Sequence, residues 1–159
     1  MMWHYGYPMT CQALFSRKGS VAEAIEQWIR SATMSVDVAI YRLTSARLAL
    51  ALAQAFGCGL SVRLVLDGTK YLENSTTRDI LAGCQFPWRL AGGRSSQQAK
   101  LHHKFAILDS RMVLTGSYNW TAESEEQNYE NLVALSDIEC ITLFLEEFEA
   151  LWAGAVEAR

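Results

Sequence analysis

The strongest constraint on the fold is the alternation of strand-like and helix-like segments in the first 66 residues. Residues 35–41 (SVDVAIY) and 61–66 (SVRLVL) are rich in β-branched residues and are typical of buried strands. A helix-like segment from about residue 45 to 56 lies between them, and Gly57 and Gly59 mark its end. Strands joined through a helix run parallel and are covered by helices. This pattern predicts an α/β protein with a mixed central β-sheet.

The remaining segments extend this pattern in both directions. Ser20 and Glu23 form a capping box that begins a helix reaching to about Ala32. Further strands are predicted at residues 12–15, 86–90, 104–109, 111–116 and 130–135, and further helices at residues 76–82 and 137–152. The turn between the strands at 104–109 and 111–116 predicts a hairpin. We expect a single domain, residues 1–159, with its core at about 11–152 and helices on both faces of the sheet.

Composition is that of a soluble globular protein. Half of the residues are hydrophobic and 19% are charged, and no apolar run approaches the roughly 20 residues that span a bilayer. The start, MMWHYGYPMT, lacks the pattern of a signal peptide, so we expect a cytoplasmic protein without stable membrane insertion. Cys11, Cys58, Cys84 and Cys140 show no C-x-x-C spacing, which favours free thiols, although Cys58 and Cys84 can still meet in space.

The formal net charge of −3 hides an uneven distribution. Residues 42–111 carry ten basic and four acidic side chains, whereas residues 112–159 carry one basic and ten acidic side chains. A basic segment attracts phosphate groups, although a solvated charged surface has the same composition.

Two adjacent histidines stand in the segment LHHKFAILDS, residues 101–110. Alternate side chains of a strand share a face, so His102 and Lys104 point to one side and His103 to the other. His102 is therefore the candidate for chemistry, and His103 is expected to be packed or to act as a supporting donor.

Further polar residues follow in the same part of the sequence. Six residues after Asp109, a turn carries Ser117 and Asn119, and Glu130 stands at the head of the next strand. An imidazole, a fixed cation, two neutral donors and a carboxylate together can hold a phosphate and stabilise charge on its oxygens. Each residue alone has an ordinary explanation in turn or surface chemistry. Their occurrence in order within 29 residues predicts a phosphate-handling site.

The segment LHHKFAILDSRMVLTGSYNWTAESEEQNYENLVAL resembles the H-x-K-x4-D-x6-G-S-x-N signature of the phospholipase D superfamily. It is most similar to the single-motif nucleases of that superfamily, which also carry an S/N-x-E-N segment like residues 128–131 here. The resemblance extends to ALFSRKGSVAEAI, SVDVAIYRLTS and VRLVLDG, and covers roughly residues 11–152. It implies a phospholipase D/nuclease-like fold.

The resemblance also implies a function for each site residue. His102 would be the nucleophile that forms a phosphohistidine intermediate. Lys104 and Asn119 would bind the non-bridging oxygens, with Ser117 in support. Glu130 would hydrogen-bond the ring nitrogen of the histidine that does not attack.

Asp109 belongs to the same signature, but at the far end of its strand we expect it to be structural rather than to touch substrate. The resemblance implies a metal-independent reaction without a cofactor, and the sequence shows no carboxylate cluster.

One histidine is not sufficient for this reaction. Double displacement at a phosphodiester needs a nucleophile on one side of phosphorus and an acid on the opposite side. The chain has three histidines, His4, His102 and His103, and no second H-x-K motif. We therefore expect a two-fold homodimer in which two copies of His102 face each other, with a bell-shaped dependence of rate on pH.

Three functions remain open from the sequence. The leading one is a nuclease that cleaves DNA or RNA with low sequence specificity, since several cations are expected near the site. These are Arg63, Lys70, Arg78, Arg89, Arg94 and Lys100. Tyr71, Trp88, Tyr118 and Trp120 are candidates for stacking on bases, with at least two expected in the core.

The second function is a lipid phosphodiesterase or phosphatidyl transferase with the same chemistry. Against it, no apolar anchor or basic amphipathic helix is visible. The third is a non-catalytic nucleic-acid-binding dimerisation module, which would not need the intact set of His, Lys, Ser, Asn and Glu.

Overall fold

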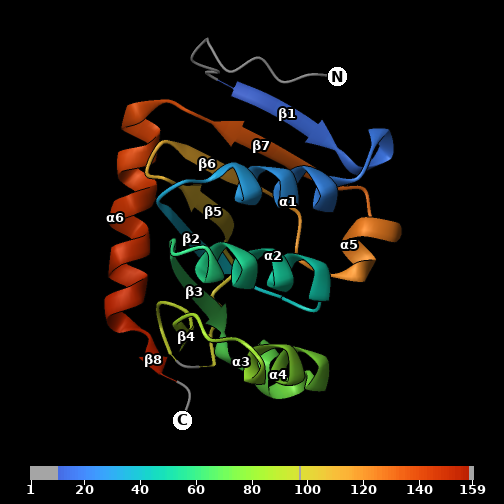
Figure 1. The fold of residues 1–159 in the computed structure, drawn as a ribbon. Coiled ribbons are helices and arrows are strands. Elements are labelled where there is room, and N and C mark those ends of the chain that lie inside the picture. The colour runs from blue at the N-terminus through green and yellow to red at the C-terminus, as the bar shows by residue number, and fades with distance from the viewer. Residues whose placement is uncertain (1–10, 97, 158–159) are drawn as a thin grey trace.

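The structure is a computed structural model that describes residues 11–96 and 98–157. These residues form an eight-stranded mixed sheet with helices on both faces (Figure 1). The mixed sheet and its covering helices are as the sequence predicts, whereas the short strand at Val156–Glu157 is not predicted. The strand order is β1-β7-β6-β5-β2-β3-β4-β8. The strands are β1 (Cys11–Phe15), β2 (Ser35–Ile40), β3 (Ser61–Asp67), β4 (Trp88–Ala91), β5 (Lys104–Leu108), β6 (Met112–Gly116), β7 (Asn131–Leu135) and β8 (Val156–Glu157).

Four of the helices lie where the sequence predicts them, within a few residues. The helices are α1 (Val21–Ser31), α2 (Ala46–Gly57), α3 (Gly68–Glu73), α4 (Ser75–Ala82), α5 (Ala122–Glu126) and α6 (Ile138–Gly154), with a 3-10 turn, η1 (Ser16–Lys18). The predicted cap of α1 is confirmed, because the Ser20 hydroxyl accepts from the Glu23 amide at 3.0 Å. The sequence does not predict α3 and α5, since six and five residues are too few to show a helical period.

The centre of the sheet follows from the connections between its strands. β2, β3 and β4 are parallel, as the intervening helices predict. β5 runs antiparallel to β2 and forms a hairpin with β6. Asp109 and Ser110 in the hairpin turn have φ angles of 53° and 52°, which suit the right-handed twist of the two strands.

The sheet separates two apolar cores. α1 and α2 pack on one face, where Leu52 of α2 and Leu64 of β3 are fully buried. α6 packs on the other face, where Phe148 is fully buried near Phe105 of β5. Because residues of a strand alternate, Ala106 belongs to the first core although Phe105 belongs to the second. The two faces therefore offer different surroundings to neighbouring residues of β5.

All four cysteines are free, as predicted. His4 lies outside the described residues. Within the ranges that the structure describes, no helix is long and apolar enough to cross a membrane.

Candidate active site

The site residues gather at one edge of the sheet, where the central strands begin or end. β2, β3 and β6 end at this edge, and β5 and β7 begin there. The register pairs Ile40 of β2 with Lys104, and Gly116 of β6 with Leu132 of β7. Segments far apart in the sequence therefore present their side chains side by side.

His102 and Lys104 form the centre of this edge. The Lys104 ammonium donates to the His102 carbonyl at 2.9 Å and lies 3.4 Å from Nδ1 of the His102 ring. Partial burial lowers the pKa of His102, and the positive charges of Lys104 and Lys100 lower it further. Burial also lowers the pKa of Lys104, and the negative charge of Glu130 opposes this effect. The lowered pKa favours the neutral form of the His102 ring, which has a free nitrogen lone pair.

His103 turns away from this centre, as the strand alternation predicts. Its Nε2 lies 3.0 Å from the Glu147 carboxylate of α6, and its ring meets the Phe105 ring edge-on with centroids 5.5 Å apart. His103 is thus on the α6 side, where its side chain remains half-exposed.

Hydrogen bonds of Ser117 link the end of β6 to the beginning of β7. Its hydroxyl donates to the Glu130 carboxylate and accepts from the Asn131 amide at 3.1 Å. The Glu130 carboxylate also accepts from the Asn128 side chain at 3.2 Å. The close approach needs glycine at position 116, since a Cβ on Gly116 would collide with the Asn131 carbonyl. The hydrogen bond from Glu130 to the histidine ring stays a prediction.

Asn119 lies in the same turn with an unsatisfied side-chain amide. Its buried Oδ1 has no hydrogen-bond partner among the residues that the structure describes. Its neighbours Tyr118 and Trp120 are buried, and the Tyr118 hydroxyl donates to Glu125 at 2.8 Å. Burial, followed by this bond to Glu125, raises the pKa of Tyr118. Two of the four candidate stacking residues are thus core anchors of the turn, as expected.

Asp109 lies at the opposite end of β5 from Lys104. Its carboxylate accepts from the backbone amides of Thr33, Met34 and Ser35 at 2.7 to 3.1 Å. Burial alone would raise the pKa of Asp109, but these hydrogen bonds lower it. Asp109 therefore ties the β5–β6 turn to the beginning of β2, away from the site edge.

Two residues that the sequence did not single out complete the site. Asp67, at the end of β3, is fully buried, and its carboxylate accepts from the Leu101 amide at 2.8 Å and the Lys70 amide at 2.9 Å. It thereby fixes the backbone immediately before His102 and the first turn of α3. Tyr41 follows β2, and its ring centroid lies 4.5 Å from that of His102. The position of Asp67 directly after a predicted strand is a capping signal, but the helix that follows is too short to show a helical period.

Three lysines surround the Tyr41 ring. The ammonium groups of Lys104, Lys70 and Lys100 lie 5.2, 5.6 and 5.8 Å from its centroid. An aromatic face attracts cations at this range. The result is a positive region directly beside His102.

Two other predicted cations, Arg63 and Arg89, lie elsewhere, and this part of the prediction was wrong. Arg63 forms ion pairs with Asp37 and Glu149 on the α6 side of the sheet, because its position alternates with that of Leu64. Arg89 donates to a carbonyl of α6 at 2.8 Å. Arg78 donates to two carbonyls of α3.

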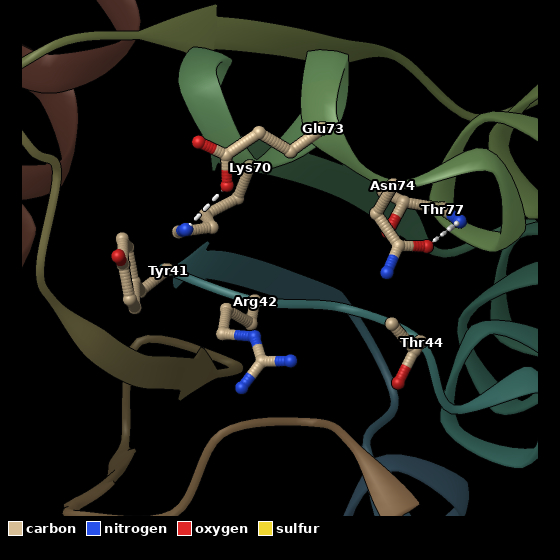
Figure 2. Close-up of a pocket in the computed structure, with 7 residues that line it drawn as sticks. All are labelled: Tyr41, Arg42, Thr44, Lys70, Glu73, Asn74 and Thr77. Atoms are coloured by element: carbon tan, nitrogen blue, oxygen red, sulfur yellow. Dashed lines mark hydrogen bonds and ion pairs between the residues drawn. The ribbon is translucent and has the colours of Figure 1, made fainter. Parts of the chain in front are cut away.

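A pocket of about 290 Å³ opens beside Tyr41 and Lys70 (Figure 2). It is lined by Tyr41, Arg42, Thr44, Lys70, Glu73, Asn74 and Thr77. These residues come from the segment after β2 and from α3 and α4. In the described part of the chain, no three His, Cys, Asp or Glu side chains gather as a metal-ligand cluster.

The fold matches solved structures of phospholipase D proteins. Nuc from Salmonella typhimurium, a phospholipase D family member, has a TM-score of 0.85 at 26% identity, covering 94% of this chain and 98% of that chain. NucT from Helicobacter pylori has a TM-score of 0.81 at 24% identity, covering 93% and 99%. The second match shows the fold alone. The mixed sheet with the histidine and lysine at its edge is thus that of a phospholipase D-like protein.

Sequence comparison leads to the same family. The family described as "Cardiolipin synthase, PLD-like domain" matches residues 25–152. A human relative named mitochondrial cardiolipin hydrolase is 30% identical over 145 residues, covering 91% of this chain and 56% of the relative. The chain belongs to the phospholipase D-like family. It spans just over half the length of that human relative.

Proposed function

We propose that this protein is a metal-independent phosphodiesterase in which His102 is the nucleophile. The observation that carries the proposal is the contact of the Lys104 ammonium with the His102 ring and carbonyl, at the sheet edge that also holds Ser117 and Glu130. A neutral imidazole attacks phosphorus, and the adjacent ammonium stabilises the charge that develops on the non-bridging oxygens.

The reaction has two displacement steps. In the first, a ring nitrogen of His102 forms a bond to phosphorus, the bond to the leaving oxygen breaks, and that oxygen takes a proton from an imidazolium. In the second, water gives a proton to the resulting imidazole and attacks phosphorus, and the phosphorus–nitrogen bond breaks. Lys104 and Asn119 bind the non-bridging oxygens, with Ser117 in support, and Glu130 orients the nucleophilic ring.

The imidazolium comes from a second copy of the chain. His103 faces α6, so one chain provides a single histidine at the site edge within the described residues. A two-fold dimer brings His102 of the partner subunit to the leaving-group side of the phosphate.

Nucleic acid, DNA or RNA, is the substrate that the charges favour. Lys70, Lys100 and Lys104 gather around one ring beside His102, and a chain of phosphates is attracted to such a cluster. Contacts of this kind read the phosphate backbone rather than the bases, so we expect little sequence preference.

A phospholipid is the second candidate substrate. The observation that favours it is the name of the human relative, a cardiolipin hydrolase at 30% identity. Cardiolipin also contains phosphodiesters, so the same two steps apply to it.

The test is hydrolysis of single- and double-stranded DNA, RNA and cardiolipin in excess EDTA. We expect cleavage of nucleic acid by the wild-type protein and its loss, by at least about a thousandfold, in His102→Ala. His103→Gln is the matched control, because it changes the adjacent histidine on the α6 side and should retain activity.

Each other outcome has a defined meaning. Cleavage of cardiolipin alone would select the lipid function. Activity that EDTA abolishes, or that His102→Ala retains, would contradict the mechanism.

A further inference from the structure

The pocket beside Tyr41 contains charges that the two displacement steps do not use. Lys70 and Glu73 reach it from α3, and Arg42 reaches it from the segment after β2 (Figure 2). Lys70 is paired with Glu73, and Arg42 lies 3.3 Å from Glu123. The polar groups of Thr77 are occupied, since its amide binds Asn74 and its hydroxyl binds the Leu43 carbonyl at 2.7 Å.

The pocket adjoins the nucleophile through Tyr41. This residue lines the pocket, and its ring centroid lies 4.5 Å from the His102 ring centroid and 5.6 Å from the Lys70 ammonium. The separation of the His102 ring centroid and the Lys70 ammonium therefore cannot exceed the sum of these two distances. Asp67 links the backbones of the two segments, because its carboxylate accepts from both the Lys70 amide and the Leu101 amide.

Two neighbouring phosphates of one nucleic-acid strand fit within this upper limit. Adjacent phosphorus atoms of a nucleic acid are joined by six single bonds, which span at most about 7 Å, the reach of two extended residues. A phosphate bonded to the His102 ring thus has its neighbour within reach of the Lys70 ammonium. The cavity of about 290 Å³ has room for this second phosphate.

We propose that the pocket formed by Arg42, Lys70 and Tyr41 binds the phosphodiester next to the scissile one. This inference rests on the proposed phosphodiesterase function and adds to it a preference for substrates with two phosphates. Glu73 competes with the second phosphate for Lys70, because it already occupies that ammonium in the free protein.

The test compares the dinucleotide TpT, with one phosphodiester, and the trinucleotide TpTpT, with two. For the wild-type protein we expect kcat/KM to be about tenfold higher for TpTpT, the effect of one charge-assisted hydrogen bond. Lys70→Gln and Arg42→Gln should reduce this ratio to about two, the statistical factor for two cleavable bonds.

Two further variants separate a direct contact from a change in net charge. Lys70→Gln combined with Glu73→Gln leaves the net charge unchanged and should still lose the preference. Glu73→Gln alone should increase it, because the lysine is then free for phosphate. Arg111→Gln removes an exposed cation near Asp109, at the other end of the sheet, and should leave the ratio unchanged.

The outcomes distinguish this inference from the function on which it rests. Cleavage of both substrates with a ratio unaffected by Lys70→Gln and Arg42→Gln would overturn the pocket and leave the nuclease standing. If neither is cleaved, the same variants are compared on cardiolipin, with two phosphodiesters, and phosphatidylglycerol, with one. A Lys70-dependent preference for cardiolipin would support the second-phosphate pocket with a lipid substrate, and its absence would overturn it. No hydrolysis of any substrate would overturn both proposals.

Discussion

His102 and His103 are neighbours in sequence, but they have different surroundings. The ring of His102 meets Tyr41 and Lys104, whereas that of His103 meets Phe105 and Glu147. The alternation of a strand separates the two rings, and burial, followed by the neighbouring lysines, lowers the pKa of His102. At the scale of a residue, the environment rather than the residue type distinguishes the proposed nucleophile from its neighbour.

Removal of the neighbouring charge should therefore be visible in the titration of His102. Lys104→Met removes a positive charge that lowers the pKa of His102, so we expect that pKa to rise. Titration of the ring resonances by NMR measures this shift without reference to activity. Arg111→Met, a cation outside the site, is the control, and an unchanged His102 titration in Lys104→Met would contradict the assignment.

At the scale of the elements, the hairpin of β5 and β6 is held by a carboxylate that lies away from the chemistry. Asp109 accepts backbone hydrogen bonds from Thr33, Met34 and Ser35, the residues that lead into β2. The opposite end of the hairpin carries Lys104 and Ser117. One hairpin thus combines a structural end and a site end, which the signature alone does not distinguish.

Asp109→Ala should destabilise the fold and leave the site intact. We expect a loss of about 1–3 kcal/mol in the free energy of unfolding at pH 7, with kcat/KM of the folded protein unchanged. The pKa of Asp109 is lowered in the folded state, so its contribution is present above the unfolded pKa and is lost as pH falls through the folded one. Urea denaturation at pH 7 and below about pH 4 measures the free energy of unfolding of wild type and variant. The difference between these two free energies should be smaller at the lower pH. A large loss of kcat/KM in the folded variant would assign Asp109 to the chemistry instead.

At the scale of the whole molecule, the described part of one chain brings a single histidine to the site edge, and the proposed reaction needs two. The positive region and the pocket lie at this edge, whereas Arg63 and Arg89 lie with α6 and the C-terminal strand. A symmetric pair of chains would join two such edges into one site.

Mixed dimers test this arrangement. When wild-type protein and His102→Ala are co-refolded in equal amounts, about a quarter of the dimers contain two wild-type chains, so we expect about a quarter of the activity. Independent sites would instead retain about half. His103→Gln mixed in the same way is the control and should cause no loss. The mass of each sample in solution, measured by light scattering, should be that of a dimer.

The sequence by itself determined the order of the main elements and the residues of the signature. The β-branched segments predict β2 and β3, and the Ser20 cap predicts the start of α1, because these patterns are local and span enough residues to show a period. The opposite orientations of His102 and His103 followed from a period of two along a strand.

Only the tertiary structure decided which other residues join them. Asp67 and Tyr41 lie at the ends of strands that are distant from His102 in the sequence. The helix α3, which carries Lys70, is too short to show a helical period in the sequence. Arg63, which the sequence suggests as a cation near the site, forms an ion pair with Asp37 of the neighbouring strand. The physical reason is that sequence patterns report the period of one element, whereas the partners of a charge depend on the register between elements.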